Sequence, residues 1–278
     1  MEPVTLPVSQ PLPRLHRAHW LALIAFGLVF VSWLFYAPAG LLGKADAVGY
    51  AVCHRIDGRS FHIGNIQMPL CARCTGIYLG VALGVAAMVV AGRGRAGALP
   101  PLRVIITLIL FIVAMGLDGV NSFLTLLPRL PHVYEPQNWL RLVTGTLDGV
   151  AMAVLIFPMF NQTLWRNWED RPVIANMREV GVLVLLAAVV IALVLSDNAV
   201  ILYPLALISV GGVVLLLTLT NSMLFMLITR TENKARAAWD ALLPLTGGLV
   251  GSFALILLID VARFVATGTW GGFIIPGA

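Results

Sequence analysis

The chain has 278 residues, of which 59% are hydrophobic and only 11% charged, and its formal net charge at pH 7 is +5. Several apolar runs exceed about eighteen residues with few or no charges, enough to cross the roughly 30 Å hydrocarbon core of a bilayer. This composition excludes an ordinary soluble domain and predicts an all-α, polytopic membrane helical bundle; the short alternating segments of a β-barrel are absent. The small positive excess is explained by loop charges that set topology, so we expect contact with the lipid bilayer and no nucleic-acid partner.

The apolar runs predict about seven transmembrane helices, at residues 20–42, 71–91, 102–127, 139–160, 179–195, 199–228 and 244–267. A short surface helix is expected within the basic connection 229–243. We divide the chain into an N-terminal tail and first span (1–43), a core with a Cys/His loop and spans two to four (44–160), and an added three-span segment (161–278). The apolar, glycine-rich tail 268–278 suits the membrane interface or the surface of another membrane subunit.

The polar stretch 53–84 interrupts this apolar pattern and contains all three cysteines. Cys71 and Cys74 form a CxxC pair at the expected start of span two, where the helix N-terminus favours thiolates. Cys53 lies upstream, followed at once by His54, and His62 lies between. Three thiolates and one imidazole would complete a structural zinc site; with water in the fourth position the site would be open and suited to catalysis.

Two other uses of the cysteines remain open. In an oxidising compartment Cys71 and Cys74 could cycle as a dithiol with Cys53 as the resolving thiol, or the cysteines could form a permanent disulfide. A c-type haem is excluded because CxxCH is required and Thr75 follows Cys74.

The distribution of Lys and Arg favours a cytoplasmic N-terminus, with eleven such residues on the cytoplasmic side and seven, Arg129 among them, on the outer side. We therefore expect a multi-pass protein of the inner (cytoplasmic) membrane with the Cys/His loop outside. This topology brings polar residues of spans three and four to the depth of that loop, as a functional cavity or as a charge-paired bundle. They are Asp118, Asn121, Asn138, Arg141 and Asp148.

Three further sequence patterns lead to predictions about contacts. The i,i+3 spacing of Asp260 and Arg263 predicts a structural salt bridge. The stripe Gly76, Gly80 and Gly84 predicts a close helix contact that holds the site rigid. The guanidinium groups of the Cys/His segment suit phosphate or carboxylate groups such as lipid headgroups, or else pair with nearby aspartates. These anion-binding candidates are Arg55, Arg59 and Arg73.

The motif blocks of the core resemble a known family. Cys53-His54, residues 59–61 (RSF) and residues 69–78 (PLCARCTGIY) are similar to the bacterial and archaeal predicted membrane proteins called domain of unknown function 2085, as are blocks 117–119 (LDG) and 138–145 (NWLRLVTG). The resemblance covers residues 50–160, with Asn121 standing where we would expect a glutamine. It implies a fold unit and a shared site, with no established activity. The residues it places together are Cys53, His54, Cys71, Cys74, Asp118, Asn138 and Arg141.

These observations favour an accessory or structural subunit of a membrane complex, whose Cys/His cluster holds zinc and fixes the 44–70 loop onto spans two to four. The alternative is a membrane enzyme that acts on a lipid, quinone or thiol substrate at the outer leaflet. In that alternative the arginines would hold the headgroup, and the metal or a thiolate would carry out the reaction.

Overall fold

The computed structural model describes residues 17–126 and 131–273; the expected N-terminal tail as far as residue 16, Arg129 and the tail residues 274–278 lie outside these ranges. Seven helices in the described residues are long and apolar enough to cross a membrane, which confirms the predicted polytopic bundle. They are α1 (Arg17–Tyr36), α3 (Ala72–Val90), α4 (Leu102–Leu124), α5 (Asn138–Leu164), α6 (Met177–Leu195), α7 (Ala199–Thr229) and α8 (Leu242–Thr267).

The largest departure from the predicted boundaries lies between the first two spans. The first span was predicted to reach residue 42, but α1 ends at Tyr36 because Pro38 disfavours a helical conformation at the residue before it. The segment 44–70, predicted as a loop, is instead largely regular. It contains most of α2 (Gly40–Val52), the 3₁₀ turn η1 (Asp57–Arg59), and the antiparallel pair β1 (Ser60–Ile63) and β2 (Ile66–Cys71).

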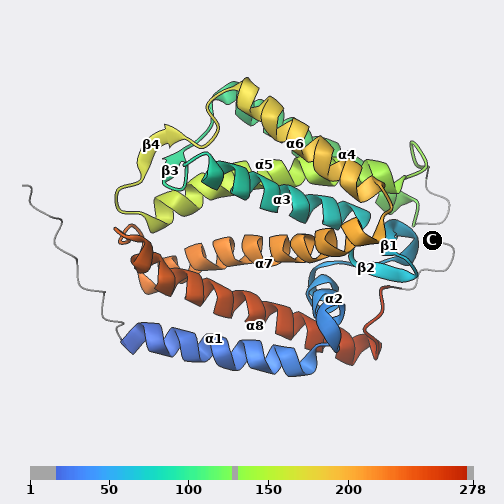
Figure 1. Cartoon of the computed structure of the whole chain (residues 1–278), viewed down its shortest axis with the longest axis horizontal. Helices are drawn as coiled ribbons and strands as arrows, with labels where there is room; N and C mark the ends of the chain where they lie inside the picture. The colour runs from blue at the N-terminus through green and yellow to red at the C-terminus, as the bar shows by residue number, and fades with distance from the viewer. Residues whose placement is uncertain (1–16, 127–130, 274–278) are drawn as a thin grey trace, which may run out of the picture.

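The long helices run side by side along the molecule (Figure 1). In this view α7 lies between the group α3, α4, α5 and α6 and the pair α1 and α8. The β1–β2 hairpin and α2 lie at one end, which we call the hairpin end. At the opposite end, β3 (Ala96–Ala98) pairs in parallel with β4 (Glu169–Pro172), and η2 (Ala238–Ala241) is the short helix expected in the connection 229–243.

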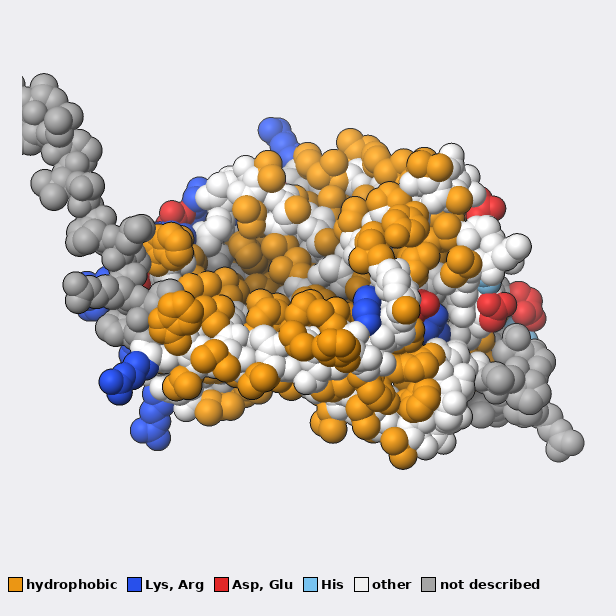
Figure 2. All heavy atoms as spheres, turned by 60° about the horizontal axis from the view of Figure 1, so that its bottom comes forward, with side chains coloured by type: hydrophobic (Ala, Val, Ile, Leu, Met, Phe, Trp, Pro, Cys, Tyr) orange, Lys and Arg blue, Asp and Glu red, His pale blue; other side chains and the backbone are white. Residues whose placement is uncertain are grey.

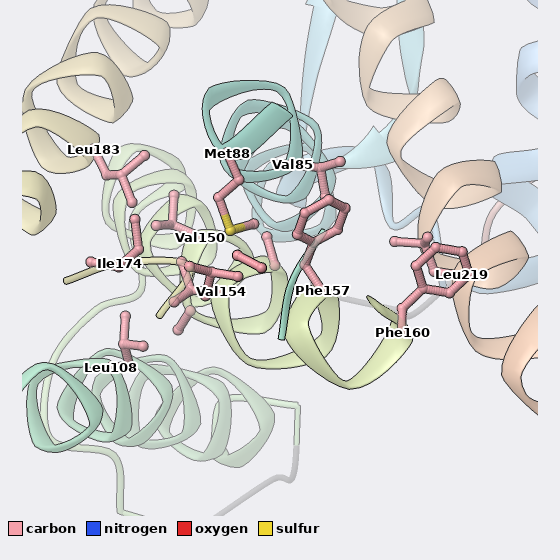
Figure 3. Close-up of a cluster of buried hydrophobic side chains, with 14 of the residues drawn as sticks. Val85, Met88, Leu108, Val150, Val154, Phe157, Phe160, Ile174, Leu183 and Leu219 are labelled. Atoms are coloured by element: carbon pink, nitrogen blue, oxygen red, sulfur yellow. The ribbon is translucent and has the colours of Figure 1, made fainter. Parts of the chain in front are cut away.

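Apolar side chains cover the outside of the bundle as well as its interior. On the face shown in Figure 2, hydrophobic side chains cover the middle of the molecule, and most charged side chains lie toward its ends. This distribution fits a bundle whose waist contacts lipid tails. Inside, Met88 of α3, Val154 and Phe157 of α5, and Leu183 of α6 belong to one buried cluster (Figure 3).

Glycines allow α3 and α5 to approach until their backbones touch. On α3, a Cβ at Gly80 would overlap the carbonyl oxygen of Thr146 on α5. On α5, a Cβ at Gly149 would overlap the carbonyl oxygen of Ile77 on α3. Small residues at the contact let membrane helices gain packing energy where no hydrophobic driving force is available. The glycine stripe predicted on span two is thus one side of a two-sided contact.

We expect Gly149→Ala to lower the stability of the purified protein. The added methyl would have to push two backbones apart, and overpacking of this kind costs about 1–3 kcal/mol. The measurement is the thermal unfolding midpoint in detergent. Gly181→Ala in α6 is the matched control, because a Cβ at Gly181 meets nothing within 4 Å. Equal midpoints for the two variants would show that the contact is looser than described.

Candidate functional site

The three cysteines converge at the hairpin end. Cys53 follows α2, Cys71 ends β2, and Cys74 lies in the first turn of α3. Their sulfur atoms lie within 4.8 Å of one another. Cys53 and Cys71 are buried and Cys74 is half-buried, and all three are free thiols. This is a grouping that could hold one metal ion.

The backbone is arranged to stabilise a thiolate at Cys53. Its Sγ accepts hydrogen bonds from the backbone N–H groups of Arg55 (3.4 Å) and Cys71 (3.3 Å). Hydrogen bonds from the Cys71 and Cys74 thiols lower the pKa of Cys53 well below its usual value. The same interaction with Cys53 raises the pKa of Cys71 to about 12. The cluster therefore favours one negative charge shared among three sulfurs, which suits it to a soft cation.

Neither candidate histidine belongs to the group of three sulfurs. The Nδ1 of His54 accepts a hydrogen bond from the backbone N–H of Ile56 (3.1 Å). His62 lies on β1, and its Nε2 is 2.9 Å from Asp57 Oδ1 at the exposed side of the hairpin. Burial lowers the pKa of His54, so its imidazole is held neutral. The described residues thus supply three converging ligand atoms, and the fourth ligand is absent from the grouping.

A second cluster of charged groups lies beside the cysteines, on the C-terminal turns of α4. Arg73 donates hydrogen bonds to Asp118 and, at 3.0 Å, to Ser122 Oγ. Arg141 Nε reaches the same Ser122 hydroxyl at 3.4 Å. Asp118 and Ser122 are 2% and 1% exposed, so this is a buried ionic network in an apolar bundle. Such networks are costly in a membrane and are found where function or packing requires them.

The remaining predicted polar residues hold the loops around this network. The side chain of Asn121 accepts from the N–H of Val133 and donates to the carbonyl of Tyr134, which fixes the α4–α5 connection. Asn138 donates to the carbonyl of Gly58 and accepts from Arg141, which joins η1 to α5. Asp148 is buried deeper along α5, and no hydrogen bond among the described residues joins it to the network.

Arg55 lies apart from the other two anion-binding candidates. It is 7% exposed, forms a 2.8 Å ion pair with Asp46 of α2, and donates to the carbonyl of Trp270. Arg55 thus pairs with an aspartate, which is the alternative to anion binding that the sequence left open for this arginine. Arg59 donates to the hydroxyl of Thr125 (3.1 Å), and so lies beside the α4 network.

The predicted salt bridge between Asp260 and Arg263 is wrong. Arg263 of α8 donates instead to the carbonyls of Tyr50 (2.5 Å) and Cys53 (2.7 Å) at the C-terminal end of α2, and its guanidinium stacks 4.0 Å from the Tyr50 ring centroid. The last carbonyls of a helix attract a cation strongly, because they lack intrahelical partners and carry the negative end of the dipole. Asp260 is fully buried, and the side chain of Trp33 on α1 faces it.

Several residues that shape the site were not predicted. Ser122 could have been found, because it follows Asp118 by one helical turn on the same face. Tyr134, whose hydroxyl donates to Asp118 at 2.7 Å, and Gln67, which donates to the carbonyl of Arg55 at 3.0 Å, come from segments with no periodic pattern. Trp270 and Phe273 fold back onto this end: Trp270 packs against Tyr50, and Phe273 donates its N–H to the His54 carbonyl.

The region that builds this site is the region shared with other proteins. A family described as "Predicted membrane protein (DUF2085)" matches residues 53–155. An uncharacterised protein of Methanocaldococcus jannaschii is 28% identical over 165 residues, which cover 55% of this chain and 99% of the relative. An uncharacterised protein of Methanothermobacter thermautotrophicus is 30% identical over 105 residues, or 37% of this chain and 83% of the relative. No solved structure matches the chain significantly.

We expect Asp118→Asn to destabilise the protein by about 3–5 kcal/mol, because it leaves the half-buried Arg73 guanidinium without its buried carboxylate partner. Chemical denaturation in detergent would measure the loss. Asp57→Asn is the matched control: Asp57 is exposed and pairs with His62 alone among the described residues, so its removal should cost at most about 1 kcal/mol. A small loss for Asp118→Asn would mean that the ion pair contributes little.

Proposed function

The chain belongs to the DUF2085 family of predicted membrane proteins, and we propose that it is a membrane metalloprotein that holds one thiophilic ion, zinc, on Cys53, Cys71 and Cys74. The observation that carries the proposal is the convergence of three sulfurs from three separate elements. Backbone N–H groups directed at the Cys53 sulfur support it further, because they stabilise the deprotonated form that a metal requires.

The ion would act first as a structural link. It would join the end of α2, the end of the hairpin and the first turn of α3, and so fix the polar segment above spans two to four. Spans five to seven carry few polar groups, and a fixed polar end on an apolar bundle suits an accessory subunit of a larger membrane complex. These features support a structural role as the leading assignment.

One observation favours an enzyme as the second candidate. Catalytic zinc sites have three protein ligands and an open position, whereas structural sites have four. The described residues bring three sulfurs together and leave both histidines outside the group. An ion held this way would act as a Lewis acid toward a lipid, quinone or thiol substrate. The arginines beside the cysteines would bind and orient the substrate.

We expect purified protein to contain about one zinc per chain by elemental analysis, and Cys53→Ser, Cys71→Ser and Cys74→Ser each to lose most of it, because each removes a thiolate ligand. His62→Ala serves as the control and should keep the metal. Metal-free protein with freely alkylated thiols would refute the proposal, and a Cys71–Cys74 disulfide in the purified protein would favour redox chemistry instead.

His54→Ala separates the two candidates in the same analysis. Loss of the metal would place His54 in the fourth position and support the closed, structural site. Retention of the metal would support the open site.

We place the hairpin end on the outer side of the inner membrane, supported by the excess of Lys and Arg on the opposite side. A cysteine introduced by Asn65→Cys, at the exposed hairpin turn, should then react with a membrane-impermeant maleimide in intact cells. One introduced by Arg103→Cys, at the exposed start of α4, should react only after permeabilisation. Labelling is scored above the unsubstituted protein, and the reverse pattern would invert the topology.

A further inference from the structure

We propose that Arg59, Arg73 and Arg141 form a binding site for a phosphate group beside the cysteine cluster, presented either on a lipid headgroup or as free phosphate. The sequence placed Arg55 among the anion-binding candidates and placed Arg141 in a separate polar cluster. The structure regroups them, because Arg55 is paired with Asp46 and Arg141 lies with Arg59 and Arg73. This proposal does not depend on whether the cysteines hold a metal.

The three guanidinium groups gather around one short stretch of α4. Arg73 and Arg141 share the hydroxyl of Ser122, and Arg59 donates to Thr125, whose own hydroxyl donates to the Ser122 carbonyl. Each arginine comes from a different element: Arg59 from η1, Arg73 from α3 and Arg141 from α5. Asn138 links two of these elements, since it accepts a hydrogen bond from Arg141 of α5 and donates one to the carbonyl of Gly58 in η1.

The charges of this group do not balance. Among the described residues, the carboxylate that contacts this group is Asp118, and its partner there is Arg73. Three positive charges therefore face one carboxylate. Like charges this close repel each other strongly in a bundle of low dielectric, so an additional anion would stabilise the arrangement.

Donor groups remain to receive that anion. Arg73 Nε is buried and makes no hydrogen bond within the described residues. Within the described residues the half-buried Arg59 side chain donates one hydrogen bond, to Thr125, so its other N–H groups are available. Two long helices, α3 and α5, also begin at this place, and no side chain caps either N-terminus. The positive dipole ends of these helices add to the attraction for an anion.

The chemistry of the donors selects the ligand class. Guanidinium forks bind phosphate oxygens in pairs, and three forks directed from three elements match a tetrahedral group with several acceptor oxygens better than a planar carboxylate. The position at the end of seven apolar helices is the depth at which lipid headgroups lie. A lipid phosphate and free phosphate share this chemistry, so experiment must separate the two sources.

The test uses the full chain purified in an uncharged detergent and in nanodiscs. In detergent, isothermal titration calorimetry with inorganic phosphate measures free-anion binding. In nanodiscs of phosphatidylcholine containing phosphatidylglycerol, native mass spectrometry counts retained phosphatidylglycerol. We expect Arg59→Gln to weaken binding in at least one arm by about tenfold or more, because it removes one charged hydrogen-bonding fork.

Three further variants keep the result interpretable. Arg103→Gln, an exposed arginine at the opposite end, should bind as the unsubstituted protein does. Thr125→Val removes the hydrogen bond of Arg59 but keeps its charge, and should change binding far less than Arg59→Gln; equal losses would assign Arg59 a merely structural role and overturn the proposal. Arg59→Lys keeps the positive charge but lacks the guanidinium group, so it should lose less affinity than Arg59→Gln. It also keeps the test valid if the glutamine variant folds poorly.

The detergent and nanodisc measurements together identify the source of the phosphate group. Arg59-dependent binding of inorganic phosphate supports a free-anion ligand, and Arg59-dependent retention of phosphatidylglycerol alone supports a lipid headgroup. No Arg59-dependent binding in either arm, or equal loss in Arg103→Gln, overturns the proposal. Zinc content measured on the same samples keeps this result separate from the fate of the metal site.

Discussion

The backbone contact between α3 and α5 sets the relative position of the two arginines at the starts of these helices. Because Gly80 and Gly149 carry no side chain, the two helices lie closer together than ordinary side chains would allow. Arg73 and Cys74 at the start of α3 are thereby brought beside Arg141 at the start of α5. The apolar length of the two helices thus acts as a rigid support for a small polar site at one end.

That site concentrates groups whose burial carries a high cost in free energy. An unpaired charge in a membrane bundle is expensive, so guanidinium groups here are held by carbonyls, hydroxyls and two carboxylates from neighbouring elements. Arg263 donates to carbonyls at the end of α2 and Arg55 pairs with Asp46, which makes both arginines supports for the loop that carries Cys53. Arg59, Arg73 and Arg141 retain an excess of positive charge, and this distinguishes the arginines of the proposed phosphate site from the two supporting ones.

Much of the fold could be predicted from the sequence, because long apolar runs have one stable solution in lipid. The location of the site could also be predicted, since the CxxC pair and the polar residues of spans three and four fall at one depth. Hydrogen-bond partners that come from distant parts of the sequence could not be predicted. The pairing of Asp260 with Arg263 followed from local spacing, but carbonyls of Tyr50 and Cys53, far away in sequence, hold Arg263 instead. Helix α2 was missed because Pro38 divides one apolar run into two helices.

The closure of this site by distant parts of the chain has a consequence for synthesis. Cys53 lies in the first fifth of the sequence, yet its backbone carbonyl is held by Arg263 of the last helix, and the carbonyl of His54 is held by Phe273. A chain emerging from the ribosome therefore has all three thiols in place long before the loop that carries Cys53 is secured. Until α8 has been inserted, the carbonyls of Cys53 and His54 lack these partners. The loop that carries Cys53 thus gains its last hydrogen bonds only when the C-terminal part of the chain has been made.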